Sequence, residues 1–242
     1  MRALTAAEVI RLWELASRYH PVDRALAVLQ LLIPDQHRDI LAGFSLGQRD
    51  QLLLAVRQAT FGDRVAGIDH CPQCDETVEF ELSCDTLLAQ SGEPGAASLD
   101  YQGYRVVLRP LNSFDLAAAA AATSLEQARA LLQRQCIVEV SLQGEAVASD
   151  QLPAGLQDRL NETALAADPQ AEILLDLDCP ACGHKWHSLL DIVHILWAEI
   201  SARAQHLLRE VHLLASAYGW SEQQILELSP TRRASYLRMV SA

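Results

Sequence analysis

The sequence is short of the residues and motifs that mark most enzymes. It contains a single lysine, Lys185, in 242 residues, which leaves almost no room for lysine-based chemistry. It also lacks four motifs of common catalytic or nucleotide-binding sites, G-x-x-x-x-G-K, G-x-S-x-G, H-E-x-x-H and G-x-G-x-x-G. We therefore predict that the protein is not an enzyme.

Long hydrophobic runs are absent too. No stretch of 18 apolar residues occurs, so we expect no membrane span. The N-terminus lacks a basic region followed by an apolar run, so we expect no secretory signal and a cytoplasmic location. A chain without an export signal keeps its thiols reduced, and this favours metal ligation over disulfide formation.

Positive charge is scarce. The formal net charge is −12, and all of the excess negative charge lies in residues 1–190, because acids and bases cancel from residue 191 onward. A protein that binds DNA or RNA normally presents a basic face that displaces counterions from phosphates. The charge balance therefore argues against nucleic acid as a partner.

Three segments differ in their hydrophobic pattern. Residues 1–62 are predicted to be helical, with capping boxes at Thr5 and at Ser45. Residues 63–190 mix strand-like runs with helical stretches. The predicted strands are 64–69, 77–82, 104–108, 136–142 and 173–177, and the predicted helices are 115–123, a segment that starts at 124, and 156–166. Residues 191–242 return to helix.

The last segment carries a heptad seam of about 26 residues, or roughly 39 Å of helix. Its members follow one another at alternating spacings of four and three: Val193, Trp197, Ile200, Ala204, Leu207, Val211, Leu214 and Tyr218. Packing on the protein's own domain is the favoured interpretation, and contact with a partner helix remains the alternative.

Four of the six cysteines form two C-P-x-C units, Cys71 with Cys74 and Cys179 with Cys182. In each unit a strand leads into a tight turn, and a second strand follows. That arrangement is typical of a zinc knuckle, in which one turn presents two thiolates to the same ion. Two knuckles complete a tetrahedral site, so we predict one structural zinc ion (Zn²⁺) per chain.

Redox chemistry is the alternative for a C-x-x-C unit. A thioredoxin-type unit opens a helix, whose N-terminus lowers the pKa of the first thiol. Here each pair is followed by strand-like sequence, and two pairs are present, so zinc is favoured. Gly183 suits the positive φ often needed after a knuckle's second cysteine, whereas the equivalent Asp75 tolerates it less well.

Four thiolates leave no open position on zinc, and catalytic zinc needs one for water. The predicted site is therefore structural, and its loss is expected to unfold the middle of the protein. A zinc hydrolase would require one cysteine to be replaced by water as a ligand.

For several other residues we predict an ordinary structural role rather than a functional one. His70, His184 and His187 flank the knuckles and are predicted to lie on the surface or behind the ligands, with replacement of a cysteine or ligation of a second metal as the alternatives. Cys84 and Cys136 are predicted to be buried thiols. Near the C-terminus, Arg232, Arg233 and Arg238 are predicted to form a solvated face rather than a docking patch.

The expected fold is therefore α+β. It is mostly helical, with a small zinc-knuckle β region in the middle and a long C-terminal helical arm. The predicted domains are an N-terminal helical segment (1–62), a zinc-stapled α/β central region (63–190) and the C-terminal arm (191–242).

The order and spacing of several segments resemble the T-even-phage-type baseplate hub assembly chaperone family of contractile phage tails and related injection systems. The matching segments are 46–53, 57–62, 71–74, 168–169, 179–186, 196–199, 211–215, 218–222, 225–226 and 229–237. Among these, the C-terminal segments match best, and zinc knuckles are not universal in the family.

The resemblance implies a non-enzymatic structural or assembly protein of the baseplate or hub. Its partners would be baseplate, hub or spike proteins, met in the cytoplasm of the producing bacterial cell. Retention in the finished particle and release after assembly are both compatible with the sequence. The alternative function is a zinc-ribbon adaptor that binds nucleic acid or the transcription machinery.

Overall fold

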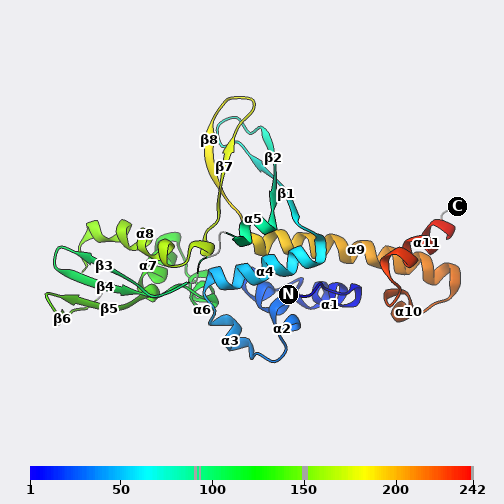
Figure 1. Ribbon diagram of the computed structural model, residues 1–242, viewed down its shortest axis with the longest axis horizontal. Coiled ribbons are helices and arrows are strands. Elements are labelled where there is room, and N and C mark those ends of the chain that lie inside the picture. The colour runs from blue at the N-terminus through cyan, green and yellow to red at the C-terminus, as the bar shows by residue number, and fades with distance from the viewer. Residues whose placement is uncertain (90–91, 93, 149–151, 241–242) are drawn as a thin grey trace.

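The computed structural model describes the whole chain except residues 90–91, 93, 149–151 and 241–242. It is an α+β fold with mostly helical secondary structure and small antiparallel sheets, as predicted (Figure 1). The helices are α1 (Ala6–Ala16), α2 (Pro21–Leu32), α3 (Arg38–Ala42), α4 (Leu46–Phe61), α5 (Cys84–Ala89), α6 (Ser113–Ala120), α7 (Leu125–Cys136), α8 (Gln157–Ala167), α9 (Ile192–Tyr218), α10 (Glu222–Leu226) and α11 (Pro230–Val240), with short 3₁₀ turns η2 (Ala154–Leu156) and η3 (Pro169–Ala171). The strands are β1 (Arg64–His70), β2 (Thr77–Ser83), β3 (Ala97–Tyr101), β4 (Tyr104–Leu108), β5 (Ile137–Leu142), β6 (Glu145–Ala146), β7 (Leu174–Asp178) and β8 (Lys185–Leu189).

A helical body formed by α1, α2, α4 and α9 holds the larger hydrophobic core. Thr5 and Ser45 cap α1 and α4 in complete capping boxes, as predicted, and Pro21 opens α2. Their buried faces meet in one cluster that includes Leu29 and Leu53. Burying a leucine side chain contributes about 1.5–3 kcal/mol, so this cluster is the main source of the body's stability.

Helix α9 runs the length of the body, from its N-cap Asp191 to Gly219, which ends it in a left-handed conformation (φ 69°) (Figure 1). Most of the predicted seam is buried, but Trp197 and Val211 are half-buried and Tyr218 is exposed. The buried face of α9 comprises Ile192, Val193, Leu196, Ile200, Ala204, Leu207, Glu210 and Leu214. This face packs on α1, α2 and α4 and then on α10 and α11, so it meets the chain's own helices.

The C-terminal arginines do not all lie at the surface. Arg232 and Arg238 are exposed as predicted, but Arg233 is only 2% exposed, and its predicted place on a solvated face is wrong. Its guanidinium donates to the carboxylate of Glu210 on α9 and to the carbonyl oxygen of Leu228. A buried arginine needs such partners because an unpaired charge away from water is very costly. This ion pair fastens α11 to α9.

A second lobe, at the left of Figure 1, has its own small core. The four-stranded antiparallel sheet has the order β3-β4-β5-β6, and α7 and α8 pack beside it. Its buried cluster consists of Val106, Leu108, Cys136, Val140, Leu156 and Leu160. The sequence did not predict β3, and Cys136 ends α7 rather than beginning the following strand.

The carboxylate of Asp168 joins this lobe to the body. It is 3% exposed and accepts hydrogen bonds from the backbone N–H of Gly47 (2.9 Å) and from the hydroxyl of Ser45, at the N-terminus of α4. Burial raises the pKa of Asp168, while these two donors favour its charged form. A Cβ on Gly47 would come within 2.0 Å of an Asp168 oxygen, so only glycine admits this approach. The backbone N–H of Leu46 also donates to the carbonyl oxygen of Leu111, across the same junction.

The predicted division into residues 1–62, 63–190 and 191–242 stays a prediction. In the structure, helices of the first and third segments share one core. In the described part of the chain, no helix is long and apolar enough to cross a membrane.

Arg57 forms an ion pair between α4 and α9. Its guanidinium, 3% exposed, binds both carboxylate oxygens of Glu199 (2.9 and 2.6 Å) and donates to the carbonyl oxygen of Gly62 (2.6 Å). We predict that Arg57→Ala lowers the free energy of unfolding by about 2–4 kcal/mol, because it leaves a partly buried carboxylate and a carbonyl without their donor. Urea denaturation measures this change. Arg64→Ala, which removes an exposed pair with Glu81, is the matched control and is expected to cost less than about 0.5 kcal/mol. Equal losses in the two variants would contradict the prediction.

Candidate metal centre

Two β-hairpins project from the helical body and carry the four cysteines at their tips (Figure 1). In one, β1 pairs with β2 up to His70 opposite Thr77; in the other, β7 pairs with β8 up to Asp178 opposite Lys185. Each turn between these pairs therefore contains six residues, 71–76 and 179–184. The predicted strand–turn–strand setting of both C-P-x-C units is confirmed.

The two hairpins face each other through alternate residues. Val65, Leu175 and Leu177 are buried, and Phe80 and Trp186 pack against the same cluster that fills the helical body. Gly67 lies opposite Phe80, and a Cβ at Gly67 would come within 2.3 Å of the ring. The aromatic ring therefore lies directly against Gly67, and a side chain at position 67 would displace it. An isolated two-stranded hairpin is marginally stable at best, so this shared core holds the hairpins in place.

The two turns have the same backbone hydrogen bonds. The N–H of Cys71 donates to the carbonyl oxygen of Glu76, and the N–H of Asp75 donates to that of Cys71. In the second turn, Cys179 donates to His184 and Gly183 donates to Cys179, and all four N···O distances are 2.9 Å.

The residue after each second cysteine has a positive φ, 73° at Gly183 and 61° at Asp75. The expectation for Gly183 is confirmed, and Asp75 adopts the same geometry without a glycine. Asp is one of the few residues other than glycine that visit this region.

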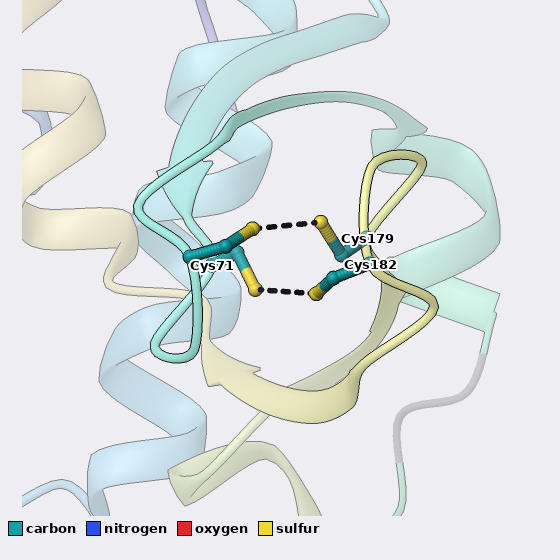
Figure 2. A group of neighbouring side chains, drawn as sticks. Cys71, Cys179 and Cys182 are labelled. Carbon is teal, nitrogen blue, oxygen red and sulfur yellow. Dashed lines mark hydrogen bonds between the residues drawn. The ribbon is translucent and has the colours of Figure 1, made fainter.

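The four sulfur atoms converge between the two turns. The Sγ of Cys71 lies 3.7 Å from that of Cys182, the Sγ of Cys74 lies 3.6 Å from that of Cys179, and all four lie within 4.8 Å of one another. Figure 2 shows two of these cysteines, Cys179 and Cys182, reaching from the second turn toward Cys71 on the first. A disulfide needs an S–S distance of about 2.05 Å, so these are free thiols.

The donor set fits a tetrahedral thiolate site. Zinc–sulfur bonds of about 2.3 Å imply sulfur–sulfur edges of about 3.8 Å, close to the two shortest separations. Cys71 and Cys179 are buried, whereas Cys74 and Cys182 are exposed, so each turn contributes one buried and one exposed cysteine.

Backbone donors in the turn favour the thiolate form of Cys179. Burial opposes its ionisation, but the N–H groups of Cys182 and Ala181 donate to the sulfur, and the pKa of Cys179 is lowered to about 7. The backbone N–H of Glu76 favours the thiolate of Cys74, but the neighbouring thiols and burial together raise the pKa of Cys74 to about 12. A cation between the sulfurs would remove this conflict, because metal ligation requires the thiolate.

The other candidates lie apart from the sulfurs. Among the described residues, the group of side chains close enough to hold an ion consists of the four cysteines. His70 approaches Asp75 (4.0 Å), His187 pairs with Asp176 (2.7 Å), and both histidines are exposed. His184 stacks on Trp186. Cys84 and Cys136 are buried in the two cores, as predicted.

Sequence reasoning missed two residues beside the turns. The indole N–H of Trp186 donates to the carboxylate of Asp69 (3.1 Å), which joins β8 to β1. These residues are 117 positions apart, and no local spacing links them. The only available signal was that each lies within four residues of a cysteine.

The fold and the site together define a mainly helical α+β protein with two cysteine-bearing hairpins. The family model described as T4 bacteriophage base plate protein matches residues 23–197. The chain belongs to this family, which confirms the resemblance to contractile-tail baseplate proteins. The matched region contains both hairpins and the lobe, whereas the C-terminal segments that carried much of the resemblance lie beyond it. No curated protein and no solved structure matches the chain.

The two turns offer a matched test of backbone strain. We predict that Asp75→Gly raises the free energy of unfolding by up to about 1 kcal/mol, because glycine removes the steric cost of a positive φ. Gly183→Ala, at the equivalent position, is expected to lower it by about 1–2 kcal/mol for the same reason. Denaturant titration of the two variants measures both changes. A destabilising Asp75→Gly together with a neutral Gly183→Ala would show that φ does not control these turns.

Proposed function

We propose that Cys71, Cys74, Cys179 and Cys182 bind one structural zinc ion. The support is the tetrahedral spacing of four sulfurs on two turns with the same hydrogen bonds. Four thiolates fill the coordination shell, so an ion in this site would have no position for a reacting water. The site therefore argues against a zinc hydrolase.

The ion would act as a cross-link between distant parts of the chain. The two sulfur pairs join residues 111 and 105 positions apart. Structural zinc contributes apparent free energies of about 10–16 kcal/mol in zinc-finger peptides, far more than a two-stranded hairpin supplies by itself. Zinc would thus add to the shared core in holding the two hairpins together.

We further propose that the protein is a non-enzymatic structural or assembly (chaperone-like) component of the baseplate of a contractile phage tail or a related injection system. The observation that carries this proposal is membership of the T4 bacteriophage base plate protein family across residues 23–197. Its partners would be baseplate, hub or spike proteins, met in the cytoplasm of the producing cell. On this proposal, residues 1–62, 63–190 and 191–242 correspond to a helical base, a zinc-stapled centre and a C-terminal arm.

The charge of the central region argues against the alternative function, a zinc-ribbon adaptor that binds nucleic acid. Residues 63–190, which include both turns, contain 20 acidic and 7 basic side chains. Four thiolates on a divalent ion would add further negative charge. Phosphate backbones would be repelled from this region. A salt-dependent shift of DNA or RNA in a gel at micromolar protein would overturn this exclusion.

Metal content is the direct test of the site. We predict about one zinc per chain in protein purified without added metal, and a four-thiolate spectrum after cobalt substitution. Cys179→Ser is expected to lose most of the zinc and to unfold the hairpins, because it removes one ligand from a closed shell.

Cys136→Ser is the matched control. It changes a buried cysteine outside the cluster whose S–H donates to the carbonyl oxygen of Gln133 (3.0 Å), a bond that serine keeps. It is expected to retain zinc. Wild-type protein without zinc, or a Cys179→Ser variant with full zinc, would contradict the proposed ligand set.

The role in assembly is tested in the producing cell. We predict that deletion of the gene yields particles without complete baseplates, as seen by electron microscopy. A gene carrying Cys136→Ser is expected to restore assembly, and one carrying Cys179→Ser is not. Mass spectrometry of purified particles separates a retained component from a chaperone that leaves. Normal tails in the deletion strain would overturn the proposed function.

A further inference from the structure

The carboxylate of Asp69 connects the two hairpins just below the sulfurs. Asp69 lies on β1, two residues before Cys71, and accepts the indole N–H of Trp186 on β8 (3.1 Å). The hydroxyl of Ser188, two residues further along β8, donates to the same carboxylate. In the described part of the chain, the polar side-chain contacts between the hairpins are those among the sulfurs and these two bonds to Asp69.

Asp69 is also fixed on its own strand. Its second carboxylate oxygen accepts the backbone N–H of His70 (2.7 Å). The Asp69 carboxylate thus accepts hydrogen bonds from three donors, the hydroxyl of Ser188, the indole N–H of Trp186 and the backbone N–H of His70. Hydrogen bonds to an ionised acceptor are stronger than neutral ones, and this one spans the gap between two sheets.

Trp186 extends the connection to the second turn. Its ring packs with the core of the hairpins and pairs across the strands with Leu177. The ring of His184 stacks on it, with centroids 6.1 Å apart and planes 9° from parallel. The carbonyl oxygen of His184 in turn accepts the N–H of Cys179. A continuous series of contacts thus runs from the Cys71 strand, through Asp69 and Trp186, to the Cys179 turn.

We propose that Asp69 and Trp186 are positioning residues. They hold the two hairpins in the relative placement that allows all four sulfurs to bind the same ion. This inference rests on the proposed zinc site. Two knuckles on separate hairpins have no covalent reason to meet, so their approach must be set by contacts between the hairpins. Asp69 acts through geometry, since its negative charge by itself disfavours four thiolates nearby.

The test is the zinc dissociation constant, measured by competition with a chromogenic chelator. Trp186→Phe keeps an aromatic ring, though a smaller one, and removes the N–H, and Asp69→Ala removes the acceptor. Each is expected to weaken zinc binding about 10- to 100-fold, the usual effect of losing a residue that supports metal ligands. At saturating cobalt both should still give the four-thiolate spectrum, because the ligands themselves are intact.

Two further variants grade the loss of the hydrogen bonds and control for general damage. Asp69→Asn keeps one carbonyl oxygen for the indole N–H, but its amide NH2 then faces the N–H of His70, so its zinc affinity should lie between those of wild type and Asp69→Ala. His187→Ala, on the outer face of β8 next to Trp186, is the matched control and should bind zinc as wild type does. If Trp186→Phe fails to fold, Asp69→Ala and Ser188→Ala carry the test, since both leave the ring in place.

The outcomes are distinct from those for the proposed function. A wild-type protein that binds no zinc would remove the metal site and this inference with it. Wild-type protein that binds zinc, together with folded Trp186→Phe and Asp69→Ala variants of unchanged affinity, would overturn the inference alone.

Discussion

The meeting of four sulfur atoms between two hairpin turns is the constraint on which the two hairpins and the proposed site depend. Each turn fixes its own pair of cysteines through the same short-range hydrogen bonds, but neither turn can set the distance to the other. The distance between the two turns is set by the packing of the inner faces of the hairpins, next to the helical body. The hairpins are too small to be stable separately, so the site and its base depend on each other.

Buried charged side chains connect the helices of the body with one another and with the second lobe. Arg57 with Glu199 joins α4 to α9 at the base of the first hairpin, Glu210 with Arg233 joins α9 to α11, and Asp168 joins the lobe to the N-terminus of α4. A buried pair adds little net stability over a well-packed apolar contact, but losing one partner is expensive. Such contacts therefore restrict the parts to one arrangement, which suits a protein whose proposed role is to present fixed surfaces to others.

On the proposed function, the central region and the protein's surfaces have different roles. A closed thiolate shell would provide rigidity without reactivity, and the acidic central region would repel nucleic acid. The work of a baseplate protein would then be done by surfaces that bind other proteins. The Asp69–Trp186 contact would contribute indirectly, by setting the geometry that makes the central region rigid.

The sequence by itself determined the features that depend on neighbouring residues. Helix starts at Thr5 and Ser45 and both cysteine pairs depend on residues three apart in the sequence, which local backbone geometry controls. The end of α9 depends on one residue, Gly219, which adopts a left-handed conformation at little cost. The tertiary structure decided what depends on packing between distant segments. The burial of Arg233, the existence of β3 and the bond between Asp69 and Trp186 carry no local signal, because each partner's position is set by how separate elements pack. The cysteine spacing showed that four thiols were available, and only the fold brought them to one point.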